Sequence, residues 1–148
     1  MIIIRTEHLN SFLVEQADVY GKIFGEHRKA RINSRLVKFL HEGDDISHHN
    51  TSVKKTTIIS ILSAEPRPGS HLSVLDSELQ ILNAMNIESV ITARFFSPKY
   101  TGTSRANKTL HINLSTVSVA YERGSYTELC FCDGDSIFIE NHKELAFN

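Results

Sequence analysis

The sequence of 148 residues contains no tryptophan, three prolines and two cysteines. A single residue separates Cys130 from Cys132, so the pair offers neither the disulfide framework of a small secreted domain nor the ligand set of a zinc knuckle. We therefore expect both thiols to remain reduced, which is typical of a cytoplasmic protein.

An excess of charge of one sign is also missing, because 16 Lys and Arg residues are balanced by 17 Asp and Glu residues. This balance excludes a generally basic nucleic-acid-binding protein, so any such role must rest on a local patch. The apolar runs span only a few residues, which predicts no transmembrane helix and no membrane partner. Residues 1–5 are too short for the apolar region of a signal peptide.

Length and composition are those of an ordinary globular protein, with 41% hydrophobic and 22% charged residues. They predict a single domain over residues 1–148. No internal repeat, low-complexity tract or linker is apparent that would divide the chain. Glycine-rich phosphate loops and the motifs G-x-S-x-G, H-E-x-x-H and C-x-x-C are also absent, so no cofactor is expected.

The C-terminal third has the clearest pattern in the sequence, that of a β-meander. Leu110, Ile112 and Leu114 alternate with polar residues, which is typical of a half-buried strand. The apolar residues then change parity, which predicts a bulge or bend near Ser115 and Thr116. We expect the following strands to continue as an antiparallel sheet.

Asp133-Gly134 predicts a two-residue hairpin turn in this meander, because such turns need a positive φ at both positions. This turn would place Leu129 opposite Phe138, while Ile137 would lie on the other face. Both faces of the hairpin would then be partly apolar, and such a hairpin is covered by helices of its own chain or by a second subunit. We therefore expect a homodimer.

Helical spacing of apolar residues predicts about three helices, two of them near the N-terminus over residues 6–24 and 28–42. A third is expected after the capping sequence at residues 73–76, with an apolar stripe that includes Leu79 and Met85. Residues 53–62 and 89–96 are strand-like. The predicted fold class is α+β with a largely antiparallel sheet.

The second predicted helix carries a basic stripe. Its cations lie at offsets 0, 3, 7 and 10 and would therefore share one helical face, which is made of Arg28, Arg31, Arg35 and Lys38. A stripe of this kind can lie along phosphates and release their counterions. The alternative is a solvated helix face whose long side chains cover the edge of the core.

A polar loop over residues 97–107 extends the basic set. Lys99 and Arg105 flank Tyr100, and an aromatic ring among cations is suited to stacking on an unpaired base. The loop is therefore a candidate for binding a partner or nucleic acid together with the stripe, although this mixture is also common in ordinary surface loops.

Two histidines suggest an alternative, catalytic function. The elements His71-Leu72-Ser73 and His111-Ile112-Asn113 resemble the paired signature of the 2H phosphoesterase family, although Asn113 replaces the Ser or Thr of that pattern. The resemblance implies a general base and a general acid on opposite sides of one phosphodiester, without a metal. Arg94 is then a candidate to stabilise the negative charge of the reaction intermediate.

His48 and His49 raise the question of a metal site, because Asp44 and Asp45 lie close by in sequence. Imidazoles and carboxylates bind divalent metals, but adjacent loop histidines rarely meet on one ion without a third ligand from elsewhere. We therefore predict no metal site.

The C-terminal third also resembles, over residues 108–145, the opening strands of a LytTR-type DNA-binding domain, which implies a regulatory role. A converging catalytic set is absent. The sequence therefore predicts a small cytosolic regulatory or interaction protein that binds a partner protein or nucleic acid through the basic helix. The alternative is a metal-independent ribonuclease or phosphodiesterase that uses the histidine pair.

Overall fold

The chain is mostly β in a computed structural model, which describes residues 11–15, 29–43, 46–48, 52–63, 71–75, 78–85, 87–96 and 108–146. These residues contain twelve strands and one α-helix, α1 (Glu78–Ala84), together with short 3-10 helices. The prediction of about three helices, two of them near the N-terminus, is therefore wrong. The α+β class holds only loosely, since a single helix accompanies the strands.

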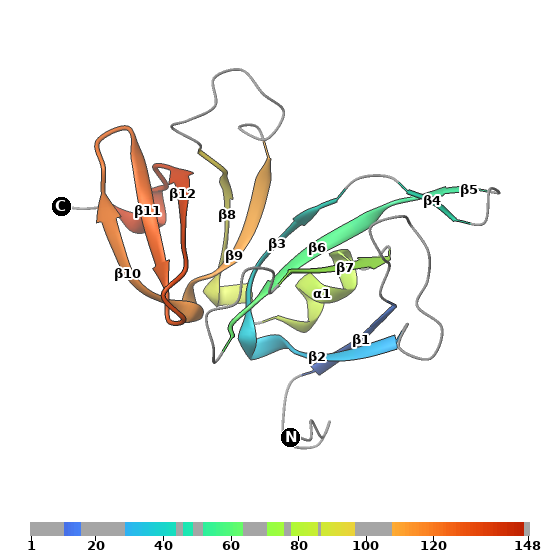
Figure 1. The fold of residues 1–148 in the computed structure, drawn as a ribbon. Helices are drawn as coiled ribbons and strands as arrows, with labels where there is room; N and C mark the ends of the chain where they lie inside the picture. Colours follow the sequence, from blue (N-terminus) through green and yellow to red (C-terminus); the bar gives the residue numbers. More distant parts are fainter. Residues whose placement is uncertain are drawn as a thin grey trace.

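The described strands pair in antiparallel sheets (Figure 1). The largest sheet has the order β7 (His71–Leu75), β6 (Thr56–Ile61), β3 (Val37–Glu42), β9 (Thr109–Asn113) and β8 (Val90–Arg94). The C-terminal meander consists of β10 (Val117–Glu122), β11 (Tyr126–Phe131) and β12 (Ser136–Glu140). Two hairpins complete the set, β1 (Ser11–Glu15) with β2 (Lys29–Asn33) and β4 (Ile46–His48) with β5 (Ser52–Lys54).

The predicted helix over residues 28–42 is replaced by β2, the 3-10 helix η1 (Ser34–Leu36) and β3, while residue 28 lies outside the described residues. Four successive residues of β3, from Val37 to Leu40, are buried, because β3 is a central strand between β6 and β9. A continuous buried run is typical of such a strand and cannot be distinguished from a buried helix by periodicity alone.

The other two predicted helices also differ from the structure. Within residues 6–24 the structure describes the strand β1, and the rest of that range lies outside the described residues. The third is present but short, as α1. Its buried side is formed by Ile81, with Met85 just after the helix, whereas Leu79 is 72% exposed.

The architecture contains an internal repeat. The segment β2-η1-β3 recurs 80 positions later as β9, the 3-10 helix η4 (Leu114–Thr116) and β10, with the same element lengths. In each copy an asparagine caps the 3-10 helix: Asn33 accepts from the Arg35 N–H at 3.0 Å, and Asn113 from the Ser115 N–H at 3.2 Å. Both following strands begin with a bulge. The expectation of no internal repeat is therefore wrong.

The correspondence extends to the other strands. The strands β1, β6 and β7 correspond to β8, β11 and β12. Each ladder of the first repeat has five residue pairs, and five pairs at the equivalent positions form the corresponding ladder of the second. One backbone hydrogen bond recurs in both copies, from the Leu62 N–H to the Leu36 carbonyl at 2.8 Å and from the Cys132 N–H to the Thr116 carbonyl at 2.9 Å. We call residues 11–75 the first repeat and residues 90–140 the second repeat.

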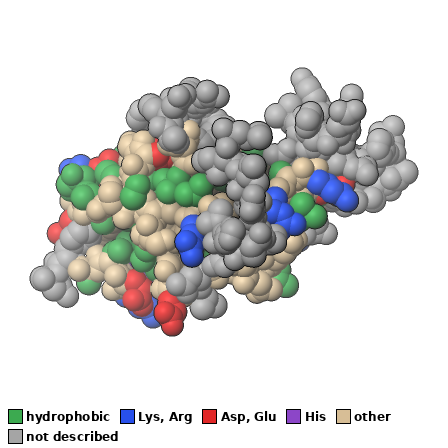
Figure 2. All heavy atoms as spheres, turned by 90° about the horizontal axis from the view of Figure 1, so that it is seen from below, with side chains coloured by type: hydrophobic (Ala, Val, Ile, Leu, Met, Phe, Trp, Pro, Cys, Tyr) green, Lys and Arg blue, Asp and Glu red, His purple; other side chains and the backbone are tan. Residues whose placement is uncertain are grey.

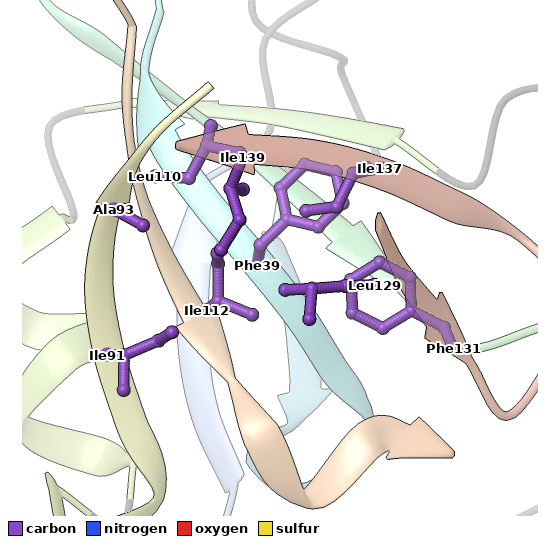
Figure 3. Packing of buried hydrophobic residues seen from close by; sticks show 9 residues of the cluster. All are labelled: Phe39, Ile91, Ala93, Leu110, Ile112, Leu129, Phe131, Ile137 and Ile139. Carbon is purple, nitrogen blue, oxygen red and sulfur yellow. The ribbon is translucent and has the colours of Figure 1, made fainter. Parts of the chain in front are cut away.

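Each repeat has its own hydrophobic core, built from equivalent positions such as Ile59 and Leu129. The first core comprises Val14, Ile32, Val37, Leu40, Ile59 and Val74, with Ile81 and Met85. The second comprises Phe39, Ile91, Ala93, Leu110, Ile112, Leu129, Phe131, Ile137 and Ile139 (Figure 3). Phe39 is the exception, because it belongs to the first repeat in sequence and packs in the core of the second.

The repeats meet where β3 pairs with β9. Phe39 lies opposite Ile112 and Leu40 lies opposite His111. Because β3 is equivalent to β10 and β9 is equivalent to β2, the two repeats present different surfaces to each other. The contact is therefore heterologous, or head-to-tail, rather than two-fold symmetric.

The meander is present, and its expected irregularity near Ser115 is the 3-10 helix η4 with the bulge that follows it. The predicted hairpin register is wrong by one residue, because Leu129 lies opposite Ile137. Gly134 has φ +88° and its N–H donates to the Phe131 carbonyl, so the turn has three residues rather than two. This shift places the large aliphatic residues of both strands together on one buried face. The prediction divides them between the two faces of the hairpin, and that part of it is wrong.

Candidate functional site

The two histidines of the predicted catalytic pair lie on different faces of the large sheet. His71 is linked by register through Ser60 of β6 to Phe39 of β3, and Phe39 lies opposite Ile112 of β9. Directly opposed residues share a face, and neighbours along a strand point to opposite faces. His111 therefore lies on the other face from His71, and the structure does not bring the two imidazoles together across one phosphate.

The environments of the two histidines agree with this assignment. The His71 ring packs against the Phe39 ring with centroids 6.2 Å apart. His111 instead contacts Glu78 of α1, with 3.0 Å between Nε2 and Oε1, and its Nδ1 lies 3.0 Å from the Thr92 hydroxyl. Arg94 lies at the end of β8, 3.9 Å from a carboxylate oxygen of Glu140.

The basic set predicted to share a helix face is spread over three elements. Arg31 is exposed on β2, Arg35 is exposed on η1, and Lys38 is buried on β3. Arg28, Lys99, Tyr100 and Arg105 lie outside the described residues, as do the side chains of His48 and His49. On the face drawn in Figure 2, the described Lys and Arg side chains form separate spots rather than one stripe.

Lys38 connects the two repeats. Its side chain is 1% exposed, and its ammonium lies 2.9 Å from Asp133 and 3.0 Å from Asp135 in the β11–β12 turn. The same nitrogen lies 5.2 Å from the centre of the Phe131 ring. Burial raises the pKa of Asp133, but hydrogen bonds from Lys38 and from the backbone N–H groups of Asp135 and Ser63 outweigh it, so the pKa is lower than usual. The surroundings of Lys38 are therefore those of a buried structural residue and not those of an exposed binding residue.

A pocket of about 370 Å³ opens at the junction of the repeats. Its apolar lining comes from Phe39, Phe95, Leu110 and Ile137, and its polar rim from His41, His71 and Lys108. An apolar floor with a few polar groups is typical of a small-molecule site. None of the described residues that line it carries a carboxylate, and the polar ones are two imidazoles and an ammonium, so the described lining is chemically suited to a small apolar molecule with one anionic group.

A second pocket of about 350 Å³ lies at the end of the same sheet and shares His41 and Lys108 with the first. Glu78 and His111 line it as well. Sequence reasoning did not bring His41, Lys108 and Glu78 together, since they come from separate parts of the chain and only the sheet order places them at one pocket. The sequence contains no local spacing that could have identified them.

The free edge of β10 is the most exposed apolar feature of the second repeat. β10 pairs only with β11 among the described strands, and Val119 and Tyr121 are 41% and 47% exposed. Figure 2 shows hydrophobic side chains gathered on the left of the molecule, the side that holds the meander in Figure 1. The equivalent edge in the first repeat, that of β3, is occupied by β9.

Among the described residues, no cluster of three or more His, Cys, Asp or Glu side chains could hold a metal ion. The helices of the described chain are all too short or too polar to span a bilayer. Comparison with known proteins finds no matching protein-family model, no matching curated protein and no matching solved structure.

Proposed function

We propose that this chain is a cytoplasmic interaction protein that binds an extended strand of a partner along the free edge of β10. The observation that carries the proposal is the difference between equivalent edges. In the first repeat this edge, on β3, holds an antiparallel strand, whereas in the second repeat β10 has no strand beside it within the described chain. The two free cysteines are consistent with a reducing compartment.

The chemistry of β10 is suited to strand addition. Its sequence, Val-Ser-Val-Ala-Tyr-Glu, contains neither the lysine nor the proline that commonly protects an edge strand from pairing. An added strand would gain main-chain hydrogen bonds along the edge, and its side chains would contact Val119 and Tyr121. Burying these two side chains would add a hydrophobic contribution.

Binding of nucleic acid has weaker support in the described chain. The predicted basic stripe does not form one surface, and its member Lys38 is held by two carboxylates. The phosphodiesterase alternative has weaker support too, because it needs two imidazoles within reach of one phosphate, and His71 and His111 lie on opposite faces of the sheet.

The test is capture of a partner from lysate of the source cells, with and without nuclease. The bait proteins are the tagged wild type, a double variant Val119→Lys/Tyr121→Lys, and a control Leu79→Lys. Leu79 is 72% exposed on α1 and is not part of β10, so its variant adds a similar surface charge elsewhere. Circular dichroism spectra establish that all three baits are folded.

We expect a discrete protein that survives nuclease and is retained by the wild type and by Leu79→Lys. The double variant should retain at least tenfold less of it, because two lysines on the edge would have to lose their hydration on pairing. Equal retention by the double variant would remove the β10 edge from the proposal. Recovery of nucleic acid alone would replace it with a nucleic-acid-binding function.

A further inference from the structure

Inside the chain, the junction between the two repeats is formed by the edges of two strands. Each of these edges has an equivalent elsewhere in the chain. The β3 edge of the first repeat and the β9 edge of the second are joined to each other. Their equivalents are β10 and β2. Among the described strands β10 pairs only with β11, and β2 pairs only with β1. Within the described chain, one edge of either kind is therefore left without a strand beside it.

The internal junction also predicts the register in which these edges fit. Because Leu40 lies opposite His111, the equivalent residues Ala120 and Arg31 would lie opposite each other. The same register places Lys29 opposite Glu122. Opposite charges directly across an antiparallel pair are favourable, so the edges are complementary in charge as well as in backbone geometry.

We propose that a second copy of this chain is the partner of the β10 edge, and that β10 of one molecule pairs with β2 of the next in this register. The inference rests on the proposed function, in that it names the strand which β10 accepts. The two edges do not pair with each other within the described chain, because β10 lies at the left of Figure 1 in the meander whereas β2 lies apart from it, at the bottom beside β1.

This pairing repeats the heterologous contact that joins the two repeats. A heterologous contact closes into a ring if its rotation brings the last free edge back to the first, and otherwise gives an open chain. In either case each junction between molecules has the architecture of the junction within one molecule. The smallest closed form is a dimer with two β10–β2 junctions.

The test is disulfide crosslinking between two single-cysteine variants, Arg31→Cys and Ala120→Cys, made in a Cys130→Ser/Cys132→Ser background. Directly opposed residues of an antiparallel pair have Cα atoms about 4.5–5.5 Å apart, within the range that a disulfide can span. The control replaces Arg31→Cys with Leu13→Cys. Leu13 is exposed and lies beside Arg31 on β1, one strand further from the partner's β10, at about 10 Å.

We expect mild oxidation of an equimolar Arg31→Cys and Ala120→Cys mixture to give a covalent heterodimer in about half of the protein, because random pairing joins unlike variants in half of the dimers. The Leu13→Cys and Ala120→Cys mixture should give at least tenfold less, because its cysteines are out of reach. Absence of a heterodimer, or equal yield in the control, would overturn the inference. A single chain that carries both Arg31→Cys and Ala120→Cys and forms only an internal disulfide, seen as a faster-migrating monomer, would overturn it as well.

The proposed function has a separate readout. If the crosslink fails while wild-type protein still captures a different discrete protein and the Val119→Lys/Tyr121→Lys variant does not, the β10 edge binds another partner. In that case the second copy is excluded and strand addition stands. Light scattering provides the independent check. The inference requires the wild type to have the mass of at least two chains, and the mass should fall to that of one chain in the Val119→Lys/Tyr121→Lys variant.

Discussion

Lys38 joins the two repeats by charge, although it belongs to a strand of the first. It reaches Asp133 and Asp135 in a turn of the second repeat, and its side chain is almost completely buried. A buried ion pair contributes little compared with well-packed apolar residues, but loss of one partner leaves an uncompensated charge. The contact therefore penalises separation of the repeats.

Asp133→Asn is expected to lower the free energy of unfolding at neutral pH by about 3 kcal/mol, because it removes the buried partner of Lys38. The pKa of Asp133 is lower in the folded than in the unfolded chain. Its stabilisation is therefore present above the unfolded pKa of about 3.9 and is lost as the pH falls through the lower folded value. Urea unfolding at a series of pH values should show a steeper acid loss for the wild type than for the variant.

Asp135→Asn is the matched control for this prediction. Asp135 contacts the same ammonium at 3.0 Å, but its side chain is 57% exposed, so solvent screens the interaction. Its substitution should have a smaller effect at neutral pH. The same acid dependence in Asp133→Asn and in the wild type would show that the Lys38 contact does not stabilise the fold.

At the scale of elements, the two 3-10 helices allow the same substitution to be compared in two environments. Asn113 is buried, and its Nδ2 donates to the carbonyl of Val37 in the other repeat at 3.0 Å. Asn33 is half-buried and accepts from the N–H of Arg35. Only Asn113 combines the cap with a described contact between repeats.

Asn113→Ala should therefore lower the free energy of unfolding by about 1–3 kcal/mol, since it leaves a buried carbonyl without this donor. Asn33→Ala should cost about 1 kcal/mol, the usual effect of a lost cap. Urea denaturation of both variants measures the difference. Equal losses would mean that the Asn113–Val37 hydrogen bond contributes nothing beyond the cap.

The elements also show which parts of the fold could be predicted from the sequence. The alternation of Leu110 and Ile112 with less buried neighbours correctly predicts the strand β9, because Leu110 and Ile112 are buried whereas Thr109 is exposed and His111 is half-buried. Leu114 lies beyond the strand, in η4. The turn at Gly134 is recognised, but its length, and hence the register, depends on one more residue that propensity does not determine.

The N-terminal half was harder to predict for a physical reason. β3 is covered on both faces, so its buried run has no two-residue alternation. The basic residues before it and Lys38 within it fall by chance at helical spacing. The repeat is also hard to detect in the sequence. Across β2-η1-β3 and its copy, only Ile32, Asn33, Val37 and Glu42 have an identical counterpart. His41 and Lys108 come together at a pocket for one reason, which is that the repeats meet there.

At the scale of the whole molecule, two small cores are joined into one folded unit. Phe39 of the first repeat packs in the second core, and the β3–β9 ladder and Lys38 cross the same boundary. Neither repeat keeps its contacts if the other unfolds. We therefore expect the described chain to unfold in one transition.

Ile59→Ala and Leu129→Ala test this expectation, since the two residues occupy equivalent, fully buried positions in different cores. Each substitution should lower the free energy of unfolding by about 2–5 kcal/mol through lost burial and a residual cavity. Circular dichroism and tyrosine fluorescence should report one coincident transition in both variants. Two separated transitions, with only one moved by each variant, would show that the repeats unfold independently.

The burial of Phe39 in the neighbouring repeat has a consequence for a chain that is cut by a protease. The covalent connection between the repeats runs from Leu75 to Val90, whereas the contacts that join them, around Phe39 and Lys38, lie elsewhere. A cut in this connection removes the tether and leaves those contacts intact. The two fragments should therefore remain associated under native conditions, and only denaturation would reveal that the backbone is broken.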